Sequence, residues 1–150
     1  MKKILFLSLI CLMALMVNAQ EYVDLGLPSG TLWKDKNEDG GFYRYDEAIS
    51  KYGSALPTKE QFEELKYSCQ WIWTGNGYKV IGPSGKSIFL PAEGYRKLNG
   101  EVIEVGEGGN YWSSTPYGSR EALYCYFNSG KERMYIHYLW RGHSIRIVKN

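Results

Sequence analysis

Cysteine and histidine are scarce in this 150-residue sequence, which has three cysteines and two histidines. None of the cysteines forms a Cys-x-x-Cys pair, so the sequence has no thioredoxin-like redox motif. Zinc and iron sites draw mainly on these two residue types, and two histidines alone would need carboxylates brought to them by folding. The composition therefore argues against the common redox and metal-dependent enzymes.

An excess of charge of one sign is also missing. The chain has 18 basic and 16 acidic residues, and Lys2 and Lys3 belong to the N-terminal segment described next. Without these two lysines the count is 16 against 16. Binding to nucleic acid needs a basic surplus that releases counterions from phosphates, so nucleic acid is a poor candidate partner.

Long apolar runs are confined to the N-terminus. Residues 4–17 form an uncharged apolar stretch between a basic start and the small-residue sequence Val17-Asn18-Ala19. This order is typical of a secretory signal peptide, which we predict at residues 1–19. The stretch is shorter than the ~20 residues of a membrane-spanning helix, so we expect no transmembrane anchor in the mature chain. Cys11 does not follow a small residue, which favours a plain signal peptide over a lipoprotein signal.

The remaining residues 20–150 are enough for one domain with its own core and too few for two. We expect an exported protein, located in the periplasm, at the cell surface or outside the cell. Cys69 and Cys125 would then lie in a compartment where a disulfide persists. Both cysteines also lie in apolar patterns that suit buried free thiols, so a bridge and two free thiols are both open.

Helix signals are confined to the first half of this domain. Asp46 is a candidate cap for a short helix that runs to Tyr52 and ends at Gly53. A second helix is predicted after Thr58, which forms a capping box with Gln61. The apolar stripe of this second helix consists of Phe62, Leu65 and Cys69.

Strand patterns occupy most of the rest. Apolar and polar residues alternate with a period of two, and turn sequences interrupt the alternation at intervals typical of antiparallel sheets. Two short helices and antiparallel sheets with long loops define an α+β domain. The expected strands are residues 22–27, 31–34, 71–73, 78–81, 87–90, 101–103, 122–127, 133–138 and 144–148.

The loop before the first helix also has the spacing of a calcium site. Asp35, Asn37, Asp39 and Asp46 occupy positions 1, 3, 5 and 12 of an EF-hand-like loop, with Gly40 at position 6. Against calcium, the preceding residues indicate a strand rather than a helix, and position 12 is usually a bidentate Glu. Asn-Glu-Asp-Gly-Gly is also ordinary hairpin-turn sequence. A solvated turn is therefore favoured, and calcium is the one candidate cofactor.

Six segments together resemble a known family, the Fibrobacter succinogenes major paralogous domains, which are small exported domains of unknown function. In this order and spacing the six are specific to the family. The resemblance implies a C-type-lectin-like fold in the version also seen in formylglycine-generating enzymes. The chain departs from the family in a short segment at 32–56 and in His143, where the family usually has an aromatic or apolar residue. The segments are VDLGLPSGT (23–31), LPTKEQFEEL (56–65), GYKVIGP (77–83), IFLPAEGYR (88–96), YWSST (111–115) and RGHSIRIV (141–148).

The superfamily that this resemblance implies contains enzymes, but the residues of those enzymes are missing here. Sulfatase-activating relatives need a close cysteine pair near the C-terminus, where this chain has Cys125 alone. Iron-dependent sulfur-transferring relatives need a histidine cluster, and only His137 and His143 are present. Ser113 and Ser114 lack a Gly-x-Ser-x-Gly elbow, so we expect them to bond to the backbone. The calcium tripeptides of sugar-binding C-type lectins do not occur either. We therefore expect a protein that is not an enzyme.

Relatives with this C-terminal pattern present a ligand face from the last third of the chain, and this sequence is aromatic there. It contains 13 Tyr and 5 Trp, side chains that give a large contact area with few rotatable bonds. Alternation along the strands predicts one inward and one outward set, although each tyrosine could equally pack inside. The predicted outward, ligand-binding set is Tyr117, Arg120, Tyr124, Tyr126, Tyr135, His137, Tyr138, Trp140 and His143. The predicted core set is Trp112, Leu123, Cys125, Phe127, Met134, Ile136, Ile145 and Val148, and Arg146 is predicted to be a structural hydrogen-bond donor.

Three functional hypotheses follow. The leading one is an exported non-catalytic module that binds a protein or a glycan through its C-terminal aromatic face. The alternative is a structural or adhesive subunit of a cell-surface assembly, which should offer a sheet edge or a donor strand to another chain. An enzyme of the superfamily comes last. The sequence leaves the oligomeric state open.

Overall fold

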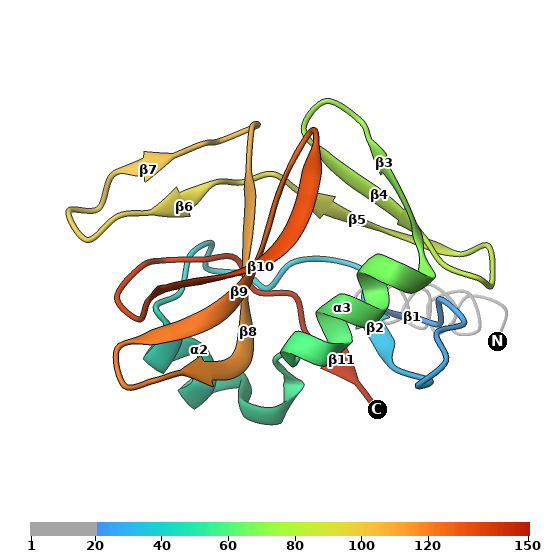
Figure 1. Cartoon of the computed structure of the whole chain (residues 1–150), viewed down its shortest axis with the longest axis horizontal. Coiled ribbons are helices and arrows are strands. Elements are labelled where there is room, and N and C mark those ends of the chain that lie inside the picture. Colours follow the sequence, from blue (N-terminus) through green and yellow to red (C-terminus); the bar gives the residue numbers. More distant parts are fainter. Residues whose placement is uncertain (1–20) are drawn as a thin grey trace, which may run out of the picture.

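The computed structural model describes residues 21–150 of the chain (Figure 1). The predicted signal peptide at residues 1–19, including Cys11, lies outside this part. Among the helices within residues 21–150, none is both long enough and apolar enough to cross a membrane. Short helices and several small antiparallel sheets make up the described chain, so the predicted α+β class is confirmed.

The two predicted helices form, one of them with the predicted cap. Helix α2 is Tyr45–Tyr52, followed by the 3-10 turn η1 at Gly53–Ala55, and helix α3 is Lys59–Ser68. The capping box is confirmed, because the Gln61 N–H donates to Thr58 Oγ1 at 3.1 Å and the Thr58 N–H donates to Gln61 Oε1 at 2.9 Å. The predicted cap at Asp46 is wrong. Arg44 is the N-cap, and Asp46 lies in the first turn, where a negative charge suits the helix dipole.

The strands form four small sheets. Their order is β1-β2-β11, β3-β4-β5, β6-β7 and β10-β9-β8. Figure 1 shows the β8–β10 sheet in the middle of the molecule. Helix α3 and the β3–β5 sheet pack against one of its faces, and helix α2 packs against the other. The strand bounds are β1 Tyr22–Val23, β2 Leu32–Lys34, β3 Gln70–Trp73, β4 Gly77–Ile81, β5 Ser87–Pro91, β6 Tyr95–Arg96, β7 Val102–Ile103, β8 Gly109–Tyr117, β9 Glu121–Asn128, β10 Lys131–Tyr138 and β11 Val148–Lys149.

The predicted strand at residues 144–148 is largely wrong. Only its end is a strand, since β11 begins at Val148. Ser144 bonds instead to β8, where it donates to the Asn110 carbonyl at 2.9 Å. The Ile147 carbonyl accepts a hydrogen bond from β2, and the Ile145 carbonyl accepts one from the loop that follows β2. The C-terminal segment thus crosses from one sheet to another, so its backbone groups are satisfied without one continuous partner strand.

Core side chains lie on both faces of the β8–β10 sheet. On one face, helix α3 contributes Phe62 and Leu65 to a cluster that includes Cys125 and Phe127. On the other face, a second cluster surrounds Trp112 and contains Tyr124, Ile145 and Ile147. The predicted core positions Trp112, Ile145 and Val148 are buried, as expected. The sheet is therefore a central layer rather than a surface with one solvated face.

The side chain of Arg146 joins the C-terminal segment to two other parts of the chain, the stretch from Lys34 to Asn37 and strand β5. It is 1% exposed. Its Nε donates to Asn37 Oδ1 at 2.8 Å, Nη1 to the Lys34 carbonyl at 3.1 Å, and Nη2 to the Phe89 carbonyl at 2.6 Å. The predicted structural role of this arginine is confirmed, because all three contacts are to the protein's own acceptors.

We expect Arg146→Leu to lower the free energy of unfolding by roughly 3 kcal/mol or more, because it leaves three buried acceptors without their charged donor. Urea denaturation followed by fluorescence measures this change. The control is Arg120→Leu, a substitution of an exposed arginine that should change stability by less than ~0.5 kcal/mol. Equal effects of the two substitutions would contradict the structural role of Arg146.

Candidate ligand-binding site

The alternation predicted for the last third of the chain is confirmed for Cys125, Phe127 and Met134. The prediction that Ile136 lies in the core is wrong, because Ile136 is 39% exposed near the end of the edge strand β10. Strands β9 and β10 pair so that Tyr135 lies opposite Tyr124, and Met134 lies opposite Cys125. Opposite residues of an antiparallel pair point to the same face. Tyr124 and Tyr135 therefore share one face with Tyr126, and Cys125 and Met134 share the face that packs on α3.

We call the face that carries Tyr124, Tyr126 and Tyr135 the tyrosine face. It is not the solvent-exposed surface that the sequence predicts. His143 is fully buried and Tyr124 is 8% exposed, so the prediction that both point outward is wrong. The C-terminal segment crosses this face and inserts His143 between Trp112 and Tyr124, with ring centroids 4.1 and 4.7 Å away. This crossing joins segments distant in sequence, which is why alternation within the strands does not show it.

The predicted set divides into three groups. His143 lies in the core, and Tyr124, Tyr126, Tyr135 and His137 line a hollow on the tyrosine face. Tyr138 and Trp140 stack on each other, with centroids 5.4 Å apart and planes 5° apart. The third group is neither buried nor part of the hollow. It consists of Tyr117, Arg120, Tyr138 and Trp140.

The hollow has a volume of about 460 Å³, which is in the range of small-molecule sites. We call it the aromatic hollow. Sequence reasoning missed five of its residues. Tyr95 from β6, Glu104 from the turn after β7 and Asn110 from β8 come from other segments, while Lys131 and Ile136 lie in β10, where the sequence predicts Ile136 as core. Its full lining is Tyr95, Glu104, Asn110, Tyr124, Tyr126, Lys131, Tyr135, Ile136 and His137.

Buried polar atoms without a hydrogen-bond partner gather around the aromatic hollow. Within residues 21–150, seven buried side-chain atoms have no such partner, and all but Trp33 Nε1 belong to four residues on this side of the sheet. Two of these residues line the hollow: Glu104 through Oε2, and Asn110 through both Oδ1 and Nδ2. The other two are Arg141 and His143. Such atoms are uncommon in folded proteins, and each calls for an explanation.

Glu104 is placed by an unusual backbone. Among the described residues it is the one non-glycine with a positive φ, 63°. Its carbonyl accepts hydrogen bonds from the N–H groups of Glu107 and Gly108, which closes the turn. A Cβ on Gly108 would lie 2.7 Å from Glu104 Oε2 and 3.4 Å from the ring of Tyr126. Glycine at this position therefore leaves room for the carboxylate at the edge of the aromatic hollow.

Two cations stand over the aromatic rings. Lys131 Nζ is 5.7 Å from the ring centroid of Tyr126 and 5.8 Å from that of Tyr135. Arg141 lies between Tyr95, at 5.1 Å, and Trp140, at 4.8 Å. These are cation–π distances. The rim of the hollow is therefore both aromatic and positively charged, while its floor carries the Glu104 carboxylate.

The two histidines form a neutral pair in which His143 is buried and His137 is half-buried in the lining of the hollow. His137 Nδ1 and His143 Nε2 are 3.0 Å apart, within hydrogen-bond distance. Burial, with a further contribution from Arg141, lowers the pKa of His137 to about 4. Burial also lowers the pKa of His143 well below its ordinary value. Burial and the charge of Glu104 raise the pKa of Tyr124, so this phenol stays protonated.

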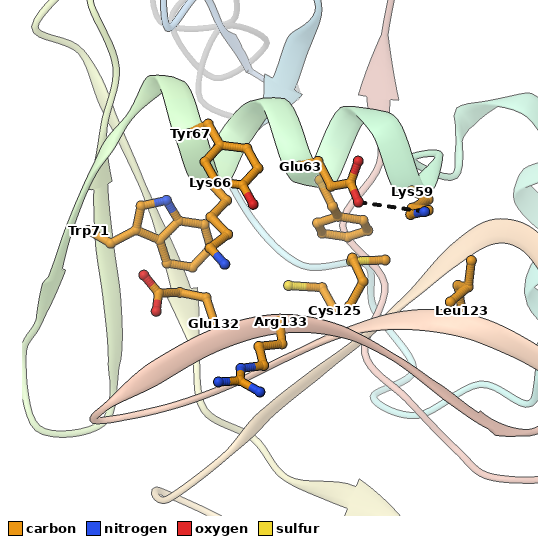
Figure 2. A pocket seen from close by; sticks show the side chains of 11 residues that line it. Lys59, Glu63, Lys66, Tyr67, Trp71, Leu123, Cys125, Glu132 and Arg133 are labelled. Atoms are coloured by element: carbon orange, nitrogen blue, oxygen red, sulfur yellow. Dashed lines mark ion pairs between the residues drawn. The ribbon is translucent and has the colours of Figure 1, made fainter.

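A second hollow, of about 400 Å³, lies between α3 and the β9–β10 strands (Figure 2). Figure 2 shows Lys59 and Glu63 on the helix, where their side chains pair at 3.7 Å, and Cys125 below them on the strands. Among residues 21–150, no residue that lines this hollow has a buried polar atom without a partner. Within that range this hollow therefore lacks the unpaired buried groups that mark the aromatic hollow, so it is a weaker candidate for a ligand site.

The two cysteines are free thiols, so of the two alternatives the structure contains the unbridged one. Cys69 ends helix α3 and Cys125 is buried in β9. Burial raises the pKa of Cys69 to about 11 and that of Cys125 to about 12. Both are therefore protonated and unreactive at neutral pH.

The loop that has the spacing of a calcium site is used for other contacts. Asn37 Oδ1 accepts from Arg146, and Asn37 Nδ2 donates to the Tyr111 hydroxyl at 3.1 Å. Asp46 lies on α2, with Oδ2 3.6 Å from Arg44 Nη2. Asp35 and Asp39 complete the predicted ligands, but no three His, Cys, Asp or Glu side chains within residues 21–150 are grouped to hold a metal. Of the four predicted ligands, Asn37 and Asp46 thus contact other side chains of the protein.

Comparisons of the chain with family models, curated proteins and solved structures find no significant match.

The histidine pair predicts loss of stability in acid. Histidines that are neutral when folded and protonated when unfolded make the unfolded state bind more protons below about pH 6.5. Their stabilisation is present above that pH and is lost as the pH falls toward about 4, where His137 titrates in the folded protein. Over this range each such histidine lowers the free energy of unfolding by up to about 1.4 kcal/mol for each pH unit of acidification.

Urea denaturation at pH 7, 6 and 5 of the wild type and of His143→Phe tests this prediction. Phenylalanine fills the space between Trp112 and Tyr124 without a titrating group. We expect the variant to lose less stability than the wild type over this pH range. Parallel losses in the two proteins would contradict the prediction.

Proposed function

We propose that this protein is an exported, non-catalytic binding module that takes its ligand, a protein or a glycan, in the aromatic hollow. The observation that carries the proposal is the hollow itself, which is lined by four tyrosines and a histidine. Aromatic rings with a few convergent polar groups are the usual lining of a ligand site. We further propose a C-type-lectin-like fold, on the strength of the six segments of the family resemblance.

The chemistry of the nucleophile candidates supports a non-catalytic role. Ser113 Oγ donates to the Leu123 carbonyl at 2.6 Å, as the sequence predicts for a structural serine. His137 and His143 bond to each other and not to a serine or cysteine. A serine nucleophile would need a histidine within hydrogen-bond reach of its hydroxyl.

Binding should depend on the rim tyrosines. We expect the fluorescently labelled wild-type protein to bind ligands on a glycan array or on a peptide array, and Tyr126→Ala with Tyr135→Ala to weaken that binding at least about tenfold. The matched control is Tyr67→Ala, which removes a tyrosine that is 79% exposed on α3. Thermal unfolding of each variant shows that the fold is retained. Ligands bound equally well by all three proteins would place the site elsewhere.

One observation favours the second candidate, a subunit of a surface assembly. Strand β10 lies at the edge of its sheet, and Ile136 and Tyr138 on it are 39% and 48% exposed. Its first residues Lys131, Glu132 and Arg133 are charged, which discourages pairing with another chain. We expect light scattering to give the mass of a monomer over a wide concentration range. If the protein instead self-associates, and the substitution Ile136→Lys abolishes that association, the assembly role is favoured.

A further inference from the structure

We infer that the ligand of the aromatic hollow is a neutral sugar, with Glu104 and Asn110 as its polar contacts and Tyr126 and Tyr135 as its stacking surface. This inference rests on the proposed function, because it assumes that the aromatic hollow is the ligand site.

A ligand that pairs with the floor of the hollow must offer both donors and acceptors. Asn110 is 1% exposed, and its Oδ1 and Nδ2 have no hydrogen-bond partner in the described part of the chain. An amide oxygen accepts and an amide nitrogen donates, so one ligand must present both functions side by side. Glu104 Oε2, likewise unpartnered among residues 21–150, adds an acceptor. Neighbouring hydroxyls of a sugar satisfy this set, because each hydroxyl both donates and accepts.

The rim offers a surface for the apolar side of such a ligand. The rings of Tyr126 and Tyr135 lie 5.8 Å apart at an angle of 54°, and Tyr95 from β6 lines the same hollow. All three are partly exposed. Tyrosine provides an apolar ring face and a polar hydroxyl tip, which together match the C–H face and the hydroxyl rim of a pyranose.

Charged and wholly apolar ligands fit this arrangement less well. A cationic ligand would compete with Lys131 and Arg141, which already stand over the tyrosine rings. An anionic ligand would meet the carboxylate of Glu104. An apolar ligand would leave the Asn110 amide and Glu104 Oε2 unpaired in an even drier site, which is costly. A neutral ligand rich in hydroxyls avoids all three conflicts.

The unpaired floor also predicts a stability signature that a purely structural asparagine would not give. Asn110→Leu keeps the branched shape of the side chain and removes two polar atoms that have no partner within residues 21–150. Replacing such a group by an apolar one of similar shape is neutral or stabilising. We therefore expect an unchanged or raised melting temperature together with a loss of sugar binding.

Saturation-transfer NMR with the purified protein is the primary measurement. The probes are glucose, galactose, mannose, N-acetylglucosamine and cellobiose, with choline and glucose 6-phosphate as charged comparisons. We expect saturable binding of at least one neutral sugar and weaker or no binding of the charged probes. Preference for choline, or for glucose 6-phosphate over glucose, would overturn the neutral-sugar assignment.

Variants locate the sugar on the floor of the hollow. Asn110→Leu should weaken binding of the selected sugar at least roughly tenfold, since it removes a donor and an acceptor. Glu104→Gln should weaken it severalfold, because a charged acceptor becomes a neutral amide. The matched control is Glu107→Gln, which neutralises an exposed carboxylate of the same turn and should leave the affinity unchanged. A folded Asn110→Leu variant with wild-type affinity would refute the inference.

The outcomes separate the two proposals. If no neutral sugar binds but a peptide does, and Tyr126→Ala with Tyr135→Ala abolishes that binding, the sugar inference fails and the proposed function stands. If a sugar binds and none of the substitutions in the hollow alters its affinity, both fail. If neither sugars nor peptides bind, both fail as well.

Discussion

The guanidinium group of Arg146 bonds to acceptors on two segments that are far apart in sequence: the end of β2 with the loop after it, which holds Asn37, and β5. Removing a charged donor from such buried acceptors costs more than the net gain of an ordinary hydrogen bond. These contacts fix where the C-terminal segment runs, and Asn37 extends them to the hydroxyl of Tyr111 on β8.

The crossing decides what the tyrosine face becomes. Because residues 142–147 are buried across it, most of that face is a second core in which His143 packs between Trp112 and Tyr124. The C-terminal segment leaves the rings of Tyr126 and Tyr135 partly exposed. Residues of the β6–β7 hairpin and of the turn after it complete the lining of the hollow there. The aromatic hollow is thus the uncovered end of a core rather than a cleft between separate parts.

The unpaired polar groups on the floor of the hollow lower the stability of the protein without a ligand. The Asn110 amide and one oxygen of Glu104 are buried without partners among residues 21–150, and Glu104 has a positive φ that its side chain disfavours. Each unpaired group costs on the order of 1–3 kcal/mol. The proposed ligand would relieve these costs, and the tilted rings of Tyr126 and Tyr135 beside the floor would give it a surface.

The sequence by itself determined the local structure. It was sufficient for the helix cap at Thr58, for the α+β class, and for the alternation that puts Tyr124, Tyr126 and Tyr135 on one face, because caps and strand periods depend on neighbours a few residues away. Only the tertiary structure decided which of these tyrosines are covered and that Glu104 and Asn110 meet them. Those facts arise from contacts between distant segments, above all the crossing held by Arg146, and no local pattern in the chain records them.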